Sequence, residues 1–185
     1  MSDKKMTSGA GHVPPSLLKE VVGKKVNRCF GCGPGNAHGL KLRFKLDHAN
    51  NSSMAKVKLP RQFEGPPGHI HGGILATLMD EAMGKVNKIF DTVSMTRHME
   101  ISYLRPSPLG VTLTVTGRFV KREGRKMFME GEIRNAAGDL LVHSKGLFIQ
   151  IDPVALFARH STQRIRAACP VAVPATKPRT ARKSQ

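Results

Sequence analysis

The stretch GHIHGGILATLMDEAMG, residues 68–84, decides the fold of this chain. From Gly72 onward it is apolar almost all round, which predicts a long helix that runs to about Ile89 and is enclosed by other structure. The charged residues in the middle of this helix are Asp80 and Glu81. A carboxylate within a core helix is costly unless it has a partner or a function. Asp80 is therefore the first candidate for a functional residue, although a structural carboxylate bonded to a neighbouring group fits the pattern equally well.

The predicted helix has two different faces. At about 100° per residue, the positions on the Asp80 face are small or polar: Gly73, Ala76, Thr77, Gly84 and Asn87. The positions on the opposite side are apolar: Leu75, Leu78, Ala82, Val86 and Ile89. Glu81 points about a quarter turn away from Asp80 and is expected to be a structural or rim charge. The small face would let another molecule approach the helix closely.

Alternating apolar residues predict strands on both sides of the helix. They occupy residues 42–46, 55–59, 95–103, 111–119, 127–133 and 140–151. Turn signals at Glu123-Gly124 and at NAAGD, residues 135–139, join the last three strands as antiparallel hairpins. We therefore expect an α+β domain in which five or six antiparallel strands wrap around one long central helix.

Length and charge divide the chain into a domain and two basic ends. The 185 residues carry a formal charge of +17, from 30 Lys and Arg against 13 Asp and Glu. We expect an N-terminal extension over residues 1–28, in which residues 16–22 could form a short helix, a domain over 29–152, and a basic, proline-containing, disordered tail over 159–185. No apolar run is long enough for a membrane span, and the early lysines precede no apolar signal, so a cytoplasmic location is expected.

The start of the helix suggests how a second chain would complete a site. His71 and Asp80 lie two and a half turns apart, on opposite sides and roughly 13 Å from one another, so they cannot pair within one chain. A two-fold dimer with antiparallel helices would bring the Gly72 and Gly73 amides of one chain towards Asp80 of the other. Free amides at the positive end of a helix suit an oxyanion. On spacing alone, the glycines could equally serve a tight turn into the helix.

These residues resemble a known family. His-Gly-Gly at residues 71–73, followed by Asp80, is similar to the signature of the hotdog-fold acyl-CoA thioesterases of the phenylacetate-pathway type. Upstream, CFGCGPGNAHGL at residues 29–40 resembles a segment of a subgroup that includes the mitochondrial long-chain acyl-CoA thioesterases of animals, with Asn36-Ala37 where Asn-Pro is usual. The resemblance covers about residues 28–152. It implies the hotdog fold, acyl-CoA thioester hydrolysis and a homodimer or dimer of dimers, and we expect no cofactor.

The resemblance also implies roles for particular residues. In that family the helix aspartate is general base or nucleophile, the amide of the first glycine polarises the thioester carbonyl, and a hydroxyl on the next strand orients water. These roles fall on Asp80, Gly72 and Thr96, and His71 matches the histidine before the glycines. Without the resemblance, Thr96 would be an ordinary strand threonine and His71 a helix-entry residue.

A basic domain suits the phosphates of coenzyme A. Candidate substrate-binding residues are Gly73, Arg97, Arg105, Arg122, Arg125 and Lys126, although any one of the basic residues could be a solvated surface charge. The alternative function is a hotdog module that binds or senses acyl-CoA without cleaving it. Specific nucleic-acid binding is not expected, because the chain has no Trp and one Tyr for stacking on bases. The acyl group is left open.

Cys29 and Cys32 form a single CxxC pair in a glycine-rich loop. The chain has no second pair at zinc spacing, and His38 is a weak third candidate ligand. Turn geometry explains the glycines better than a phosphate loop does. We therefore expect no metal from the sequence.

Overall fold

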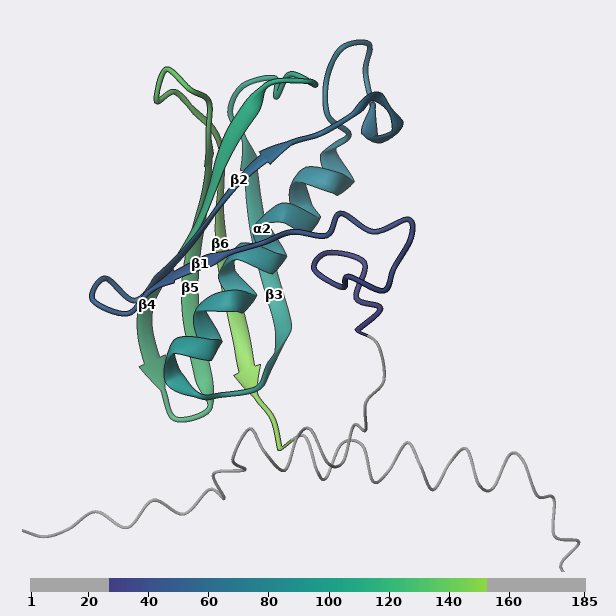
Figure 1. The fold of residues 1–185 in the computed structure, drawn as a ribbon. Coiled ribbons are helices and arrows are strands. Elements are labelled where there is room, and N and C mark those ends of the chain that lie inside the picture. The colour runs from purple at the N-terminus through teal and green to yellow at the C-terminus, as the bar shows by residue number, and fades with distance from the viewer. Residues whose placement is uncertain (1–26, 153–185) are drawn as a thin grey trace, which may run out of the picture.

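The fold is one helix against one curved sheet. The computed structural model describes residues 27–152; the expected short N-terminal helix and basic tail lie outside this range. The long helix α2 (Gly72–Val86) lies across one face of a six-stranded sheet that curves around it (Figure 1). The strand order is β1-β2-β4-β5-β6-β3, and all neighbours are antiparallel. The predicted α+β class is confirmed.

Each of the six predicted strands has a counterpart. The strands are β1 (Lys45–Asp47), β2 (Ser52–Lys58), β3 (Ser94–Tyr103), β4 (Thr112–Glu123), β5 (Lys126–Arg134) and β6 (Leu140–Gln150), and the short 3-10 turns are η1 (Arg61–Phe63) and η2 (Asn87–Phe90). The first strand is shorter than predicted and begins later. Leu42 is buried, but its N–H donates to the Gly31 carbonyl at 2.8 Å, so it belongs to the preceding loop rather than to the sheet.

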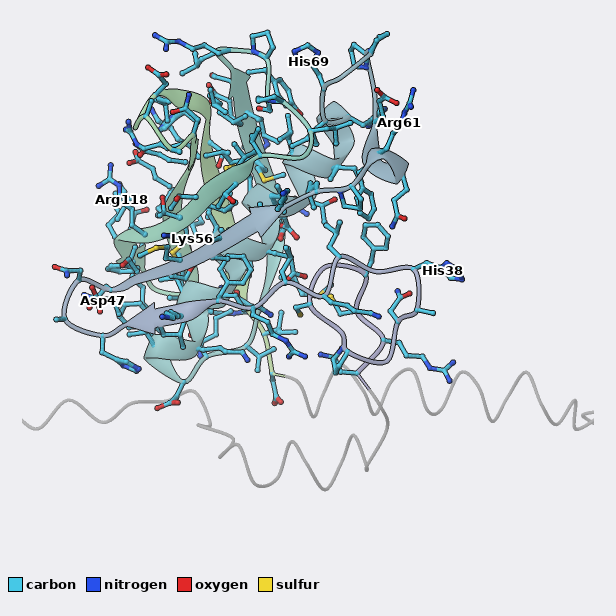
Figure 2. The ribbon with its side chains drawn as sticks, turned by 45° about the horizontal axis from the view of Figure 1, so that its top comes forward. His38, Asp47, Lys56, Arg61, His69 and Arg118 are labelled. Carbon is cyan, nitrogen blue, oxygen red and sulfur yellow. The ribbon has the colours of Figure 1, made fainter. Side chains whose placement is uncertain are left out.

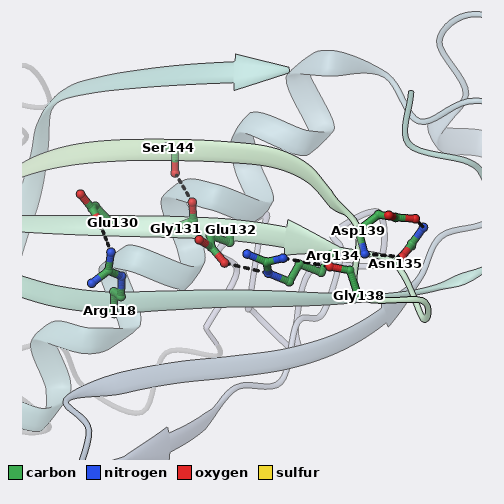
Figure 3. Close-up of polar contacts among 9 residues, drawn as sticks. All are labelled: Arg118, Glu130, Gly131, Glu132, Arg134, Asn135, Gly138, Asp139 and Ser144. Carbon is green, nitrogen blue, oxygen red and sulfur yellow. Dashed lines mark hydrogen bonds and ion pairs between the residues drawn. The ribbon is translucent and has the colours of Figure 1, made fainter. Parts of the chain in front are cut away.

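The two predicted hairpin turns are present. Gly124 and Gly138 have φ angles of 57° and 90°, which glycine adopts without strain. In the second turn, the Asp139 N–H donates to the Asn135 side-chain oxygen at 2.9 Å, and the Asn135 amide donates back to the Asp139 carboxylate at 2.8 Å (Figure 3). These hydrogen bonds fix the register of β5 against β6.

The apolar side of α2 forms the core with the sheet. Its buried residues are Leu75, Leu78, Met79, Ala82, Met83 and Val86. Gly117 of β4 allows the closest approach, because a Cβ there would collide with the main chain of Ala82. The Ser53 hydroxyl donates to the Ala82 carbonyl at 2.6 Å from the neighbouring strand. The helix is therefore held against β2 and β4 and leaves its other side open.

The two predicted helix faces are confirmed with one exception. Asn87 was expected on the Asp80 face, but it is only 3% exposed. The reason is that α2 ends at Val86 and the chain continues as the tighter η2 turn, in which the Asn87 amide donates to the Gly84 carbonyl at 3.1 Å. No helix within residues 27–152 is long and apolar enough to cross a membrane.

Candidate active site

The structure pairs Asp80 with Thr96. Asp80 is half-buried on the open side of α2, and the first residues of β3 pass beside it. The Thr96 hydroxyl donates to Asp80 Oδ1 at 2.6 Å. Within residues 27–152 no group donates to the other carboxylate oxygen, Oδ2, and no cation forms an ion pair with it. A fixed carboxylate with one free oxygen can accept a proton from water or attack an electrophile.

Asp80 and Thr96 line a cavity of about 440 Å³. Its wall also contains Ser94, whose hydroxyl is buried and finds no hydrogen-bond partner among the described residues. Phe148 of β6 supplies an apolar surface in the same cavity. The alternating pattern of β3 did not identify Ser94 as a site residue, because a serine within a strand has no sequence feature that marks it as functional.

The other end of α2 supplies one free amide rather than two. His71 is the N-cap, and its Nδ1 accepts a hydrogen bond from the Gly73 N–H at 3.0 Å. The Gly73 amide is therefore occupied, which weakens its predicted role as a substrate-binding donor. No acceptor among residues 27–152 faces the Gly72 N–H. The Tyr103 hydroxyl donates to the Gly72 carbonyl at 3.1 Å and steadies this first turn.

Gly72 lines a separate open cleft of about 550 Å³ with Tyr103, Leu104 and Arg105. None of the residues that line this cleft lines the Asp80 cavity. The cleft takes its α2 residues from the first turn, whereas the Asp80 cavity takes them from residues 80–85, in the second half of the helix. Gly72 and Asp80 of one chain therefore do not meet. This agrees with their spacing along the helix.

The predicted phosphate contacts fall into two groups. Arg105 lies at the Gly72 cleft and forms an ion pair with Asp139 at 2.9 Å. Arg122 and Arg125 lie at the other end of the sheet, where both donate to Gln150. Gln150 pairs with Ser94 in the sheet, so this second group is on the Asp80 side of the molecule. The remaining candidates, Arg97 and Lys126, are exposed.

A second polar cluster joins the N-terminal loop to α2. The Cys29 thiol donates to Glu81 Oε1 at 3.0 Å, and Lys85 Nζ lies 3.2 Å from Glu81 Oε2 and 2.8 Å from Cys32 Sγ. Glu81 is thus a structural charge, as expected, but its partners come from a loop about 50 residues away in sequence. His38, the third metal candidate from the sequence, is exposed at the outer edge of that loop (Figure 2).

The environment of this cluster shifts two ionisable groups in opposite senses. Burial raises the pKa of Glu81, but the hydrogen bond from Cys29 and the charge of Lys85 outweigh it and hold the pKa below its ordinary value. Burial lowers the pKa of Lys85, while the Cys32 contact and the Glu81 charge raise it above its ordinary value. Both groups are therefore charged near neutral pH.

The comparisons with known proteins agree with this geometry. The family model of the thioesterase superfamily matches residues 67–142. A solved thioesterase superfamily protein is 35% identical, with a TM-score of 0.63, over 70% of this chain and 67% of its own. The chain belongs to the thioesterase superfamily. The hotdog fold expected from the residue motif is thereby confirmed.

Two further relatives of this thioesterase superfamily chain differ in their sequence identity to it and in the share of the chain that they match. The acyl-coenzyme A thioesterase THEM4 of Xenopus laevis is 36% identical over 92 residues, which are 49% of this chain and 41% of that protein. The chain thus matches less than half the length of this curated relative. The PaaI protein of the E. coli phenylacetic acid degradation operon has the same fold, with a TM-score of 0.57 and 21% identity over 61% of this chain and 81% of that one.

Proposed function

We propose that the protein hydrolyses the thioester of an acyl-CoA to the free acid and CoA. The observation that carries this proposal is the hydrogen bond from Thr96 to Asp80 at the wall of a cavity on the open side of α2. Among the described residues the other carboxylate oxygen has no partner, so it is available in the cavity where water and substrate would meet. Membership of the thioesterase superfamily, and the name of the THEM4 relatives, support a thioester of CoA as the substrate class.

In the proposed reaction, Asp80 Oδ2 takes a proton from water as the water oxygen attacks the thioester carbonyl carbon. The Gly72 N–H stabilises the negative charge that develops on the carbonyl oxygen. When the tetrahedral intermediate collapses, the carbon–sulfur bond breaks and the CoA sulfur receives the proton that Asp80 had taken. Direct attack by Asp80 is the alternative: its oxygen bonds to the carbonyl carbon, the carbon–sulfur bond breaks as CoA leaves as a thiolate, and water then hydrolyses the anhydride, giving the acid and a proton for the thiolate. Thr96 fixes the carboxylate in either case, and His71 acts by capping the helix that carries Gly72.

The proposal requires a second copy of the chain, because the free Gly72 amide and the Asp80 carboxylate line different cavities. An antiparallel arrangement of two α2 helices would form two composite sites, each with Gly72 from one chain and Asp80 from the other. The same arrangement would bring the basic group around Arg105 towards the group around Arg125, giving the CoA phosphates cations from both chains. A homodimer or dimer of dimers is therefore part of the proposal, and the cytoplasmic location stays a prediction from the sequence.

The test is release of CoA thiol from a panel of short, long and aromatic acyl-CoA esters. We expect turnover of at least one ester, and a kcat lower by about a hundredfold or more for Asp80→Asn, the scale of losing a positioned base. Asn has the same shape as Asp, so unchanged acyl-CoA binding in this variant serves as the control. Binding without turnover in the wild-type protein would favour the non-catalytic acyl-CoA module, and an Asn variant with full turnover would remove Asp80 from the reaction.

A further inference from the structure

Outside the proposed reaction, three potential metal ligands converge between the N-terminal loop and α2. The Sγ atoms of Cys29 and Cys32 and a carboxylate oxygen of Glu81 all lie within 4.8 Å of one another. We propose that Cys29, Cys32 and Glu81 bind a thiophilic divalent cation of the zinc class. Two thiolates with a carboxylate are a ligand set that Zn²⁺ accepts, and three protein ligands leave one tetrahedral position for water.

The main chain of the loop directs two hydrogen-bond donors at the first sulfur. The backbone N–H groups of Gly31 and Cys32 donate towards the Cys29 sulfur, although burial and the Glu81 contact keep the pKa of the metal-free thiol above its ordinary value. Hydrogen bonds from the main chain to a ligand sulfur orient it and stabilise its negative charge when a metal is bound. The Gly33 N–H closes the turn by donating to the Cys29 carbonyl at 2.9 Å. A CxxC segment in this conformation presents both sulfurs to the same point.

Two glycines of the loop make this arrangement of ligands possible. A Cβ at Gly31 would collide with the side chain of Glu81, and a Cβ at Gly33 would collide with the main chain of Cys29. Both positions are buried. The glycines of this loop therefore do more than shape a turn, because one of them makes room for a carboxylate from α2 beside the two thiols.

The charges around the site balance once a divalent cation is added. Two thiolates and the Glu81 carboxylate would carry three negative charges, one more than Zn²⁺ neutralises. Lys85 supplies the remaining positive charge, at 2.8 Å from Cys32 Sγ and 3.2 Å from Glu81 Oε2. Binding would release the thiol protons of Cys29 and Cys32 to solvent, so affinity should rise with pH.

The site is separate from the proposed reaction but shares its cavity. Cys29, Cys32 and Glu81 line the same space of about 440 Å³ as Asp80, so water can reach the open metal position. Asp80 directly precedes Glu81 in the sequence, but it is not part of the cluster and accepts a hydrogen bond from Thr96 instead. A bound cation would fasten the loop to α2 beside Asp80. Metal binding is measured without substrate, so its failure would leave the proposed hydrolysis untouched.

The experiment adds Co²⁺ under nitrogen to the full chain, which has been reduced beforehand and freed of reductant. We expect one Co²⁺ per chain, with the intense near-ultraviolet absorption of thiolate-to-cobalt charge transfer, and displacement of Co²⁺ by one equivalent of Zn²⁺. C29S and C32S should each abolish this band and weaken Zn²⁺ binding by at least about a hundredfold, and E81Q should weaken it by at least about tenfold.

The matched control is C169S, which removes the third cysteine of the chain and should leave the absorption and the affinity unchanged. Far-ultraviolet circular dichroism of each metal-free variant shows whether it folds, and any one folded ligand variant suffices for the test. Absence of stoichiometric Co²⁺ binding in the reduced wild type would overturn the proposal. So would wild-type affinity in a folded C29S, C32S or E81Q variant, or loss of the band in C169S.

Discussion

At the scale of one residue, the hydroxyl of Thr96 is predicted to matter for turnover. It donates to Asp80 at 2.6 Å, and Thr96→Val removes this donor while keeping the shape of the side chain. We expect kcat to fall by about tenfold to a hundredfold, less than for loss of the base itself, with KM nearly unchanged. Thr96→Ser keeps the hydroxyl and should retain most of the turnover. Equal rates for the Val and Ser variants would show that Thr96 has no part in positioning Asp80.

Glu81 gives a second prediction at this scale, on stability. Its pKa in the folded chain lies below its ordinary value of 4.5, so its charged contacts stabilise the fold above that value and are lost as the pH falls through the folded pKa. Its side chain is 14% exposed. With a chelator present, Glu81→Gln should therefore lower the free energy of unfolding at pH 7 by about 1–3 kcal/mol.

Urea unfolding of both proteins between pH 7 and pH 3 tests this expectation. The difference between wild type and variant should shrink as the pH falls below about 4.5, because the wild-type carboxylate then takes up a proton. A difference that is the same at every pH would mean that packing, rather than the charge of Glu81, accounts for the loss of stability.

The site residues that lie on one helix could be predicted from the sequence, because the helical period determines where they stand relative to one another. Asp80 was visible as a charge within an apolar helix, and the spacing from His71 to Asp80 excluded a pair within one chain. The cluster around Glu81 was not visible, because Cys29 comes from a loop whose position depends on how the whole chain folds. The sequence offered only His38 as a weak third candidate and predicted no metal, whereas the fold places Glu81 beside the two cysteines and leaves His38 exposed.

At the scale of the elements, the contact between α2 and β4 depends on the absence of a side chain at Gly117. A Cβ there would meet the main chain of Ala82 and come within 2.8 Å of Met83 N. Neither group can move without displacing the helix. Gly117→Ala should therefore lower the free energy of unfolding by about 3 kcal/mol, the upper range for an overpacked core.

Gly84→Ala is the matched control for this contact, because it adds the same methyl group to the open side of the helix. There the nearest atom to the new Cβ is Phe148 Cε1 at 3.7 Å, an ordinary contact distance. Replacing a helical glycine by alanine should raise the intrinsic helix stability by about 1 kcal/mol. Urea unfolding at low protein concentration compares the two variants. A Gly117→Ala protein as stable as wild type would show that α2 does not press against β4.

The helix and the strands were predictable from the sequence because their hydrophobic patterns repeat with different periods. Strand β5 alternates buried and half-buried residues along its length and β4 does so over its first half, whereas the long apolar segment between turn signals does not alternate and was predicted as the helix. The exceptions to this agreement lie at the start of β1 and at the end of α2. β1 begins later than its apolar residues suggest, and Asn87 turns inwards because the chain leaves the α-helical conformation after Val86. The first departure results from the hydrogen bond between Leu42 and the preceding loop, and the second from the tighter turn that follows α2. Hydrophobic periodicity contains neither.

At the scale of the whole molecule, the separation of Gly72 from Asp80 leads to a prediction about two chains in one assembly. Asp80→Asn removes the proposed base. Gly72→Leu should keep the fold, because the first Cβ atom would lie 3.8 Å from the Tyr103 ring, while the longer side chain fills the cleft beside the amide. Each variant alone should be inactive. Unfolded together and refolded, they should form hybrid dimers in which one of the two composite sites has both native residues.

We expect such a mixture to regain about a quarter of the wild-type kcat per chain, since random pairing makes half of the dimers hybrid and each hybrid has one intact site of two. Different affinity tags on the two variants allow the hybrid to be isolated and its thiol release measured directly. The control is a mixture in which one chain carries both replacements and the other is wild type; its hybrid has no intact composite site. Activity in that control hybrid, or none in the isolated first hybrid, would mean that each site lies within one chain and that the second copy is not needed to complete it.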